Sequence, residues 1–169
     1  MASIALDHIT VVDATPVELA AVAAQTGCDG VCIFLNAMPD ALPRLPAYDL
    51  IADAQARRDL RKTCDDLGVS IDLAYPFTLA GRTDIATFVP ALAASAELGI
   101  PAINALLYDR EPARRVERFA AFCESARGFG MDVAVEFYPA SQIKSLADAL
   151  DLLATAGQSN AVLNIDLLH

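Results

Sequence analysis

The chain has 169 residues, 55% of them hydrophobic, which leaves room for a sizeable core, and we expect a single domain over residues 1–169. Its formal net charge of −10 disfavours nucleic acid as a partner, because such binding depends on Lys and Arg that neutralise phosphates. The sequence has no apolar run of about 18 residues and no basic signal-peptide region at its N-terminus, so we expect a cytoplasmic protein without a membrane partner.

Strand-like and helix-like segments alternate along the first half of the chain. Residues 3–9 predict a strand. The capping box Thr15-Pro16-Val17-Glu18 then predicts a helix that ends before Gly27. The segments that follow are a strand at 31–35, a polar loop at 36–48, a helix at 51–67 and a strand at 69–75. The loop is longer than a simple connection requires, which is typical of loops near a site.

The second half continues the alternation. Asp84 opens a helix that runs to Leu98 and contains Pro90, so we expect a kink or a late start there. The remaining segments are a strand at 102–108, a helix at 112–127, a strand ending in Glu136, a helix capped by Ser145 with Asp148, and a strand ending in Asp166. The charged residues of the helices at 51–67 and 112–127 predict exposed outer faces.

This regular alternation predicts a parallel sheet with right-handed crossovers, either as an open doubly wound sheet or as a (β/α) barrel. The first strand–helix turn has no GxGxxG motif and the chain has no P-loop, which weakens the nucleotide-binding version of the open sheet. The distinctive polar residues stand at the C-terminal ends of strands, where barrel enzymes keep their chemistry. We therefore predict an α/β fold, a parallel (β/α) barrel of TIM type with about six βα units.

Two carboxylates form the main candidate site. Glu136 follows the apolar run Val133-Ala134-Val135, and Asp166 ends the next predicted strand. A carboxylate at the exit of a buried strand is costly unless it has a partner. Neighbouring parallel strands lie about 5 Å apart, so the two groups could share one divalent cation. The alternatives are a salt bridge from Glu136 to an arginine such as Arg110, and a helix-capping role for Asp166.

Other polar and aromatic residues are secondary candidates for substrate binding. His8, beside Asp7, could face a substrate cavity or be a core histidine with its hydrogen bonds satisfied. Tyr75, Tyr108 and Phe137, at predicted strand ends, could wall a sugar pocket or simply pack. Inward hydrogen bonds could also come from polar residues within strands, namely Asp72, Asn104 and Asn164.

The segments AVEFYP (134–139) and NIDLLH (164–169) resemble the xylose isomerase-like TIM barrel superfamily, which includes sugar phosphate isomerases and epimerases, inosose dehydratases and endonuclease IV. The resemblance implies that Glu136 and Asp166 are ligands of a divalent metal ion and that His169, in the Asp-x-x-His arrangement, lies beside the substrate. Such oxygen ligation favours Mn, Mg or Co, with Zn possible once a histidine joins.

The chain departs from the superfamily pattern in its number of strands. The barrels of that superfamily have eight strands, and the last two supply a further histidine or similar ligand and a second glutamate. Only six strands are predicted here, so the C-terminal part of the barrel is missing. We expect a fragment of a longer protein. One alternative is a homo-oligomer or partner chain that completes the barrel, and the other is a protein that exists as an incomplete barrel.

The resemblance implies a metal-dependent isomerase or epimerase that acts on a sugar, a sugar phosphate or a hydroxy-keto acid. Glu136 would transfer a proton through an enediolate. A polyol dehydratase on the same site, or a non-catalytic incomplete barrel that binds a ligand or partner, are the alternatives. An endonuclease IV-like activity is disfavoured because it needs a histidine-rich site and the chain has two histidines. Without the last two strands we expect little activity from this chain alone.

Overall fold

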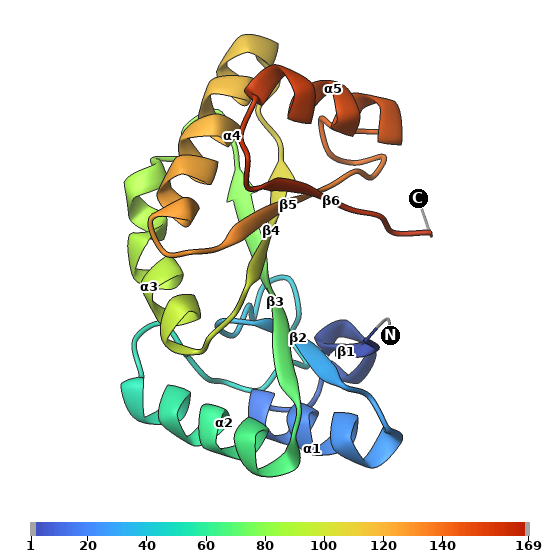
Figure 1. Ribbon diagram of the computed structural model, residues 1–169, viewed down its shortest axis with the longest axis vertical. Helices are drawn as coiled ribbons and strands as arrows, with labels where there is room; N and C mark the ends of the chain where they lie inside the picture. The colour runs from blue at the N-terminus through green and yellow to red at the C-terminus, as the bar shows by residue number, and fades with distance from the viewer. Residues whose placement is uncertain (1–2, 168–169) are drawn as a thin grey trace. The chain divides into compact units, whose positions relative to one another are not determined.

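The computed structural model describes residues 3–167, and it contains six strands that alternate with helices (Figure 1). The strands are β1 (Ala5–Asp7), β2 (Gly30–Phe34), β3 (Ser70–Leu79), β4 (Ala102–Leu107), β5 (Asp132–Glu136) and β6 (Ala161–Asn164). The helices are α1 (Pro16–Thr26), α2 (Ala54–Leu67), α3 (Val89–Glu97), α4 (Pro112–Arg127) and α5 (Leu146–Ala156), with short 3-10 helices η1 (His8–Val11) and η2 (Ile85–Phe88). The strands follow chain order in the sheet. Strands β1, β2 and β3 pair in parallel, as do β4, β5 and β6. The predicted α/β fold with six βα units is confirmed.

The chain divides into two compact units. The first comprises residues 1–75 and 93–101, and the second comprises residues 76–92 and 102–169. The prediction of one domain over residues 1–169 stays a prediction. None of the helices in residues 3–167 has both the length and the apolar character needed to span a bilayer.

In the first unit, α1 and α2 pack side by side and bury an apolar core (Figure 1). The predicted capping box is present: the Thr15 hydroxyl accepts a hydrogen bond from the backbone N–H of Glu18, and the Glu18 carboxylate accepts one from the backbone N–H of Thr15. Gly27 ends α1 in the left-handed conformation, with φ of 77°. The core side chains with no exposed surface include Leu19 and Ala23 of α1, Leu60 of α2, and Val31 and Ile33 of β2.

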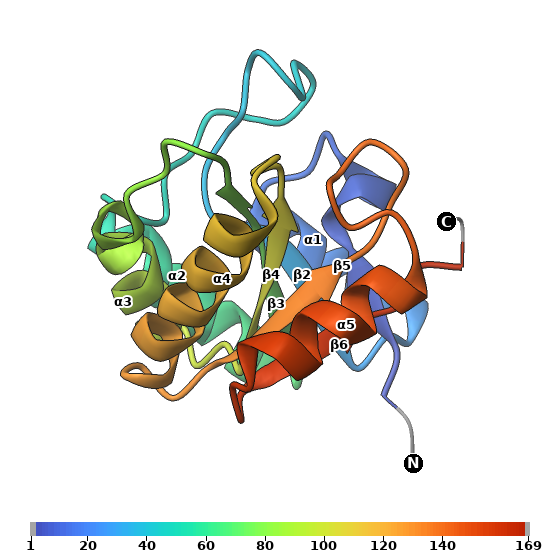
Figure 2. The same cartoon turned by 90° about the horizontal axis from the view of Figure 1, so that it is seen from above.

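In the second unit, α4 and α5 cover one face of β5 and its neighbours (Figure 2). Val133 and Val135 of β5 have no exposed surface. Phe122 of α4 is also fully buried and contacts Phe77 and Phe88, with ring centroids 5.4 and 5.3 Å away. This apolar layer fixes the orientation of β5, and therefore which residues of that strand point to its other face.

The boundaries of α2, β3 and β6 differ from the sequence prediction. Helix α2 begins at Ala54 rather than at residue 51, because the Asp53 side chain caps it by accepting two backbone N–H groups. The helix around Pro90 starts late, as predicted, with η2 ahead of α3. Strand β3 extends to Leu79, so Tyr75 lies inside the strand and not at its end. Strand β6 ends at Asn164, two residues before Asp166.

The predicted exposed charged faces are partly wrong. The Arg57 side chain of α2 is only 12% exposed, and it donates to the Glu97 carboxylate and to the backbone oxygens of Leu50 and Ile51. Arg118 of α4 donates to backbone oxygens of the loop that follows β3. These arginines join segments of the fold, which a helical pattern of charges could not reveal.

Candidate functional site

The main candidate residue, Glu136, lies at the end of β5 on the face opposite the valine layer. The parallel register pairs Glu136 with Asn164 of β6. It also pairs Ala134, two residues earlier on β5, with Asn104 of β4. Because side chains alternate between the two faces of a strand, Asn104, Glu136 and Asn164 share one face. Three neighbouring strands thus contribute one polar side chain each to the same place.

These three side chains form a hydrogen-bonded row. The Nδ2 of Asn104 donates to Oε2 of Glu136 at 2.5 Å. The Nδ2 of Asn164 lies 3.5 Å from Oδ1 of Asn104, at the limit of a hydrogen bond. Asn104 is buried, whereas Glu136 and Asn164 are half-buried. The sequence alternative of a salt bridge to Glu136 is not seen among the residues that the structure describes, where Asn104 is its hydrogen-bond partner.

Two tyrosines stand near this row. Tyr108 follows the last residue of β4, and burial together with the negative charge of Glu136 raises the pKa of its hydroxyl. The ring of Tyr138 lies edge-on to that of Tyr108, with centroids 6.2 Å apart. Tyr108 thus lies close enough to Glu136 for that charge to act on its hydroxyl, while the predicted role of Tyr108 in substrate binding stays a prediction.

The other predicted metal ligand, Asp166, is half-buried on the segment that leaves β6. It lies two residues beyond Asn164, the register partner of Glu136, so the two carboxylates belong to neighbouring chain segments. The prediction that Asp166 ends the strand itself is wrong, because the ladder stops at Asn164. His169 lies outside the described residues.

A divalent metal ion would find part of a ligand set here. Glu136 and Asp166 supply carboxylate oxygens, the donors that Mn and Mg prefer. Within residues 3–167, however, no group of three or more His, Cys, Asp or Glu side chains is placed to hold a metal ion. The oxygen chemistry of these two carboxylates is compatible with the predicted Mn, Mg or Co, and a bound metal ion stays a prediction.

The remaining candidates, His8 and Tyr75, belong to the first unit. His8 has no exposed surface. Its Nδ1 accepts from the backbone N–H of Phe34 at 3.4 Å, and its Nε2 lies 2.9 Å from the backbone oxygen of Ala14, to which it donates. Burial lowers the pKa of His8, which favours the neutral ring. This is the geometry of a core histidine with its hydrogen bonds satisfied, the alternative given for His8 from the sequence, and contact with a substrate stays a prediction.

Tyr75 is held by the carboxylate of Asp7. The Tyr75 hydroxyl donates to Oδ1 of Asp7 at 2.6 Å, and the same oxygen accepts the backbone N–H of Ile9 at 2.9 Å. Burial, and then the charge of Asp7, raises the pKa of Tyr75. The ring of Tyr75 meets Phe34 edge-on at 4.4 Å. The tyrosine is thus tied to β1 and β2, and its predicted role in substrate binding is untested.

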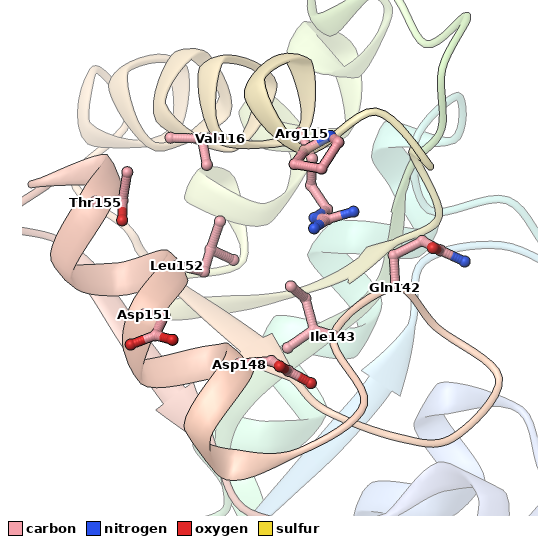
Figure 3. Close-up of a pocket in the computed structure, with 9 residues that line it drawn as sticks. Arg115, Val116, Gln142, Ile143, Asp148, Asp151, Leu152 and Thr155 are labelled. Atoms are coloured by element: carbon pink, nitrogen blue, oxygen red, sulfur yellow. The ribbon is translucent and has the colours of Figure 1, made fainter.

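A pocket of about 220 Å³ lies between α4 and α5 (Figure 3). Arg115 and Val116 come from α4, Asp151 and Thr155 come from α5, and Ile143 comes from the loop that precedes α5. Because α4 and α5 cover the opposite face of the strands from Glu136, this pocket is separate from the candidate site. Sequence reasoning missed it, since a gap between two helices leaves no mark in either helical pattern.

No protein-family model matches the chain, and no curated protein sequence matches it. Solved structures do. The probable 3-DHS dehydratase AsbF, involved in petrobactin synthesis, from Bacillus anthracis superposes with a TM-score of 0.79 at 16% identity, covering 99% of this chain and 64% of that one.

Two further structures share the same arrangement. A D-psicose 3-epimerase determined in the presence of D-fructose gives a TM-score of 0.75 at 16% identity, with 96% of this chain and 62% of that chain covered. A xylose isomerase-like TIM barrel/4-hydroxyphenylpyruvate dioxygenase fusion protein gives 0.72 at 19% identity, with 96% of this chain and 26% of that chain covered.

These likenesses define the fold. The chain has the fold of xylose isomerase-like TIM barrel proteins, which include sugar epimerases and a dehydratase among the similar structures. It spans 64% of the length of the dehydratase and 62% of that of the epimerase, so six strands represent an incomplete barrel. The resemblance seen at AVEFYP and NIDLLH is therefore confirmed at the level of fold.

Proposed function

We propose that this chain is the larger part of a metal-dependent isomerase or epimerase, with Glu136 as the group that moves the proton. The observation that carries the proposal is the position of Glu136 at a strand end, half-buried and hydrogen-bonded to Asn104 on the face away from the core. Similarity to the fold of a D-psicose 3-epimerase supports a sugar or a related hydroxy-ketone as the substrate.

In the proposed reaction, Glu136 accepts a proton from the carbon next to the substrate carbonyl, and the electron pair of the broken C–H bond moves into an enediolate. Return of a proton to the other face of that carbon gives the epimer, and return to the neighbouring carbon gives the isomer. A divalent ion held in part by Glu136 and Asp166 would supply Lewis-acid stabilisation of the substrate oxygens. Tyr108 and His169 are proposed to contact substrate hydroxyl groups, with His8 and Tyr75 as further candidates.

A second candidate is dehydration, supported by the likeness to the probable 3-DHS dehydratase. The first step is the same removal of a proton beside a carbonyl. The enolate then expels a hydroxide from the next carbon, which leaves as water once protonated. A non-catalytic incomplete barrel that binds a ligand or partner is the remaining alternative, and it requires neither metal binding nor proton removal.

The test measures metal binding and proton removal separately on the purified chain. Mn²⁺ affinity is followed by electron paramagnetic resonance, and proton removal by incorporation of deuterium from D₂O into D-fructose or D-psicose, observed by NMR. Exchange needs a base on only one face of the substrate, so it is expected even where full turnover is absent. Both signals are expected to be lost in Glu136→Gln, and metal binding to be weakened in Asp166→Asn.

Asp132→Asn is the matched control. Asp132 is an exposed carboxylate at the other end of the same strand, so its loss is expected to leave both signals unchanged. A folded chain that neither binds Mn²⁺ nor exchanges deuterium would overturn the proposal and favour the binding-module alternative. The mass in solution, recorded in the same experiment, shows whether copies of the chain associate.

A further inference from the structure

We propose that Asn104 and Asn164 are positioning residues that orient the carboxylate of Glu136 through a one-way row of hydrogen bonds. The expected effect of these residues on metal binding rests on the proposed function of Glu136. The row itself is a feature of the fold, with one residue from each of three consecutive strands.

The charge of Glu136 sets the direction of the row. An ionised carboxylate only accepts hydrogen bonds, so Asn104 must present its amide NH₂ to Oε2. The carbonyl oxygen of Asn104 then points the other way and is left to accept, and the NH₂ group of Asn164 faces it at 3.5 Å. The carboxylate of Glu136 thus fixes which way the Asn104 amide is turned, and the Asn104 carbonyl in the same way fixes the Asn164 amide.

The row leaves one oxygen of Glu136 available. Within residues 3–167, Oε2 accepts from Asn104 and no hydrogen bond to Oε1 is formed. A hydrogen bond to a charged group is shorter and about twice as strong as one between neutral groups. Asn104 therefore holds the carboxylate plane and leaves Oε1, with both of its lone pairs, as the oxygen better placed to bind a metal ion or take a proton.

Because Asn104 is buried, a water molecule could not easily take its place as the hydrogen-bond donor to Glu136. Its side chain lies on a strand flanked on both sides, and the residue is only 4% exposed. Among residues 3–167, Asn104 is the one side chain that donates a hydrogen bond to Glu136, so truncation of Asn104 to alanine would leave the carboxylate without that donor. Asn164 acts one step further away and should have a smaller effect.

The first arm of the test is Mn²⁺ affinity of the full chain. Groups that orient a metal ligand typically contribute about 10- to 100-fold in affinity, so Asn104→Ala is expected to weaken Mn²⁺ binding by about that factor and Asn164→Ala by less. Asn104→Asp keeps the shape and replaces the donor with a second carboxylate oxygen, so it is expected to lose the orientation as well.

The control is Asn160→Ala. Asn160 is also a buried asparagine, 8% exposed, but its amide donates to the backbone oxygens of Cys123 and Met131 and not to Glu136. Its loss is expected to lower the stability of the fold without lowering Mn²⁺ affinity. Equal losses of affinity in Asn104→Ala and Asn160→Ala, or wild-type affinity in Asn104→Ala, would overturn the positioning role.

The second arm needs no metal, and it separates this inference from the proposed function. The side-chain amide signals of Asn104 and Asn164 are followed by ¹⁵N NMR in wild type and in Glu136→Gln. Both are expected to shift in the variant, while that of Asn160 stays in place. If the wild-type chain binds no Mn²⁺ but these shifts occur, the proposed metal binding by Glu136 is wrong and the hydrogen-bonded row is supported. If the Asn104 signal does not move, the row is wrong whatever the metal does.

Discussion

Arg114 holds the carboxylate of Asp109 with two hydrogen bonds of 2.6 Å each, one from Nε and one from Nη2. The Asp109 side chain is only 1% exposed, and Arg118 approaches it at 3.5 Å. Asp109 follows β4 and the arginines belong to α4, so this group of charges fixes the turn between them. It is a structural ion pair at the strand end, distinct from Glu136.

We predict that Asp109 makes the fold sensitive to acid. The hydrogen bond from Arg114 lowers the pKa of Asp109 to about 2. In the unfolded chain the value is near 4. The folded state therefore gains stability from this group above about pH 4 and loses it as the pH falls from about 4 to about 2. Asp109→Asn should lower the free energy of unfolding at neutral pH, and its difference from wild type should shrink over that range in urea titrations.

Asp132→Asn, at an exposed site on β5, serves as the control for the loss of one negative charge. It is expected to leave the free energy of unfolding nearly unchanged at neutral pH. A difference between wild type and Asp109→Asn that stays constant down to pH 2 would contradict the lowered pKa.

We predict that Tyr75 stays un-ionised in the folded chain at a pH where free tyrosine is ionised. Burial and the charge of Asp7 raise its pKa, so this tyrosine favours the folded state until the pH rises above the usual value near 10. In an ultraviolet titration of phenolate at about pH 11, folded wild type and Tyr75→Phe should give the same absorbance change. When both proteins are unfolded in urea at the same pH, the phenolate absorbance of the variant should be smaller by the contribution of one of the four tyrosines.

Tyr75→Phe also removes the hydrogen bond to Asp7, and the expected loss is about 1.5 to 3 kcal/mol in the free energy of unfolding, the usual range for a bond to a charged group. A smaller phenolate signal in the folded variant than in folded wild type would show that Tyr75 ionises normally.

Gly30 is expected to tolerate no side chain. A Cβ there would lie 2.5 Å from Oδ2 of Asp72 and 2.6 Å from Oγ of Ser70, two groups that hydrogen-bond to each other at 2.6 Å. Gly30→Ala should therefore cost about 1 to 3 kcal/mol of stability, measured by urea unfolding. In a background carrying Ser70→Ala and Asp72→Ala the same change should cost much less, because the clashing atoms are gone. Equal costs in both backgrounds would contradict the close approach.

Local signals in the sequence predicted the fold well. The capping box at Thr15 and the helix from Pro112 to Arg127 appear in the structure as predicted, because caps and prolines act through their immediate neighbours. The alternation of strands and helices then determines the fold class, since parallel strands require crossovers. Boundaries were wrong where a side chain changed the start of a helix, as with Asp53 ahead of α2.

The site was only partly predictable. Glu136 stands at the end of a strand with an apolar run before it, and that pattern identified it. Asn104 was named from the sequence as a source of inward hydrogen bonds, but its pairing with Glu136 could not be found, because the two are 32 residues apart and meet only through the strand register. The burial of Asp109 was missed for the same reason, since its two arginines looked like part of an exposed helical face.

Adjacent residues of β5 serve different purposes. Val135 lies in the layer beneath α4, and Glu136, the next residue, belongs to the polar row. A change at Val135 should therefore loosen the packing beneath α4 and lower stability, whereas a change at Glu136 should alter the polar row and leave that packing in place.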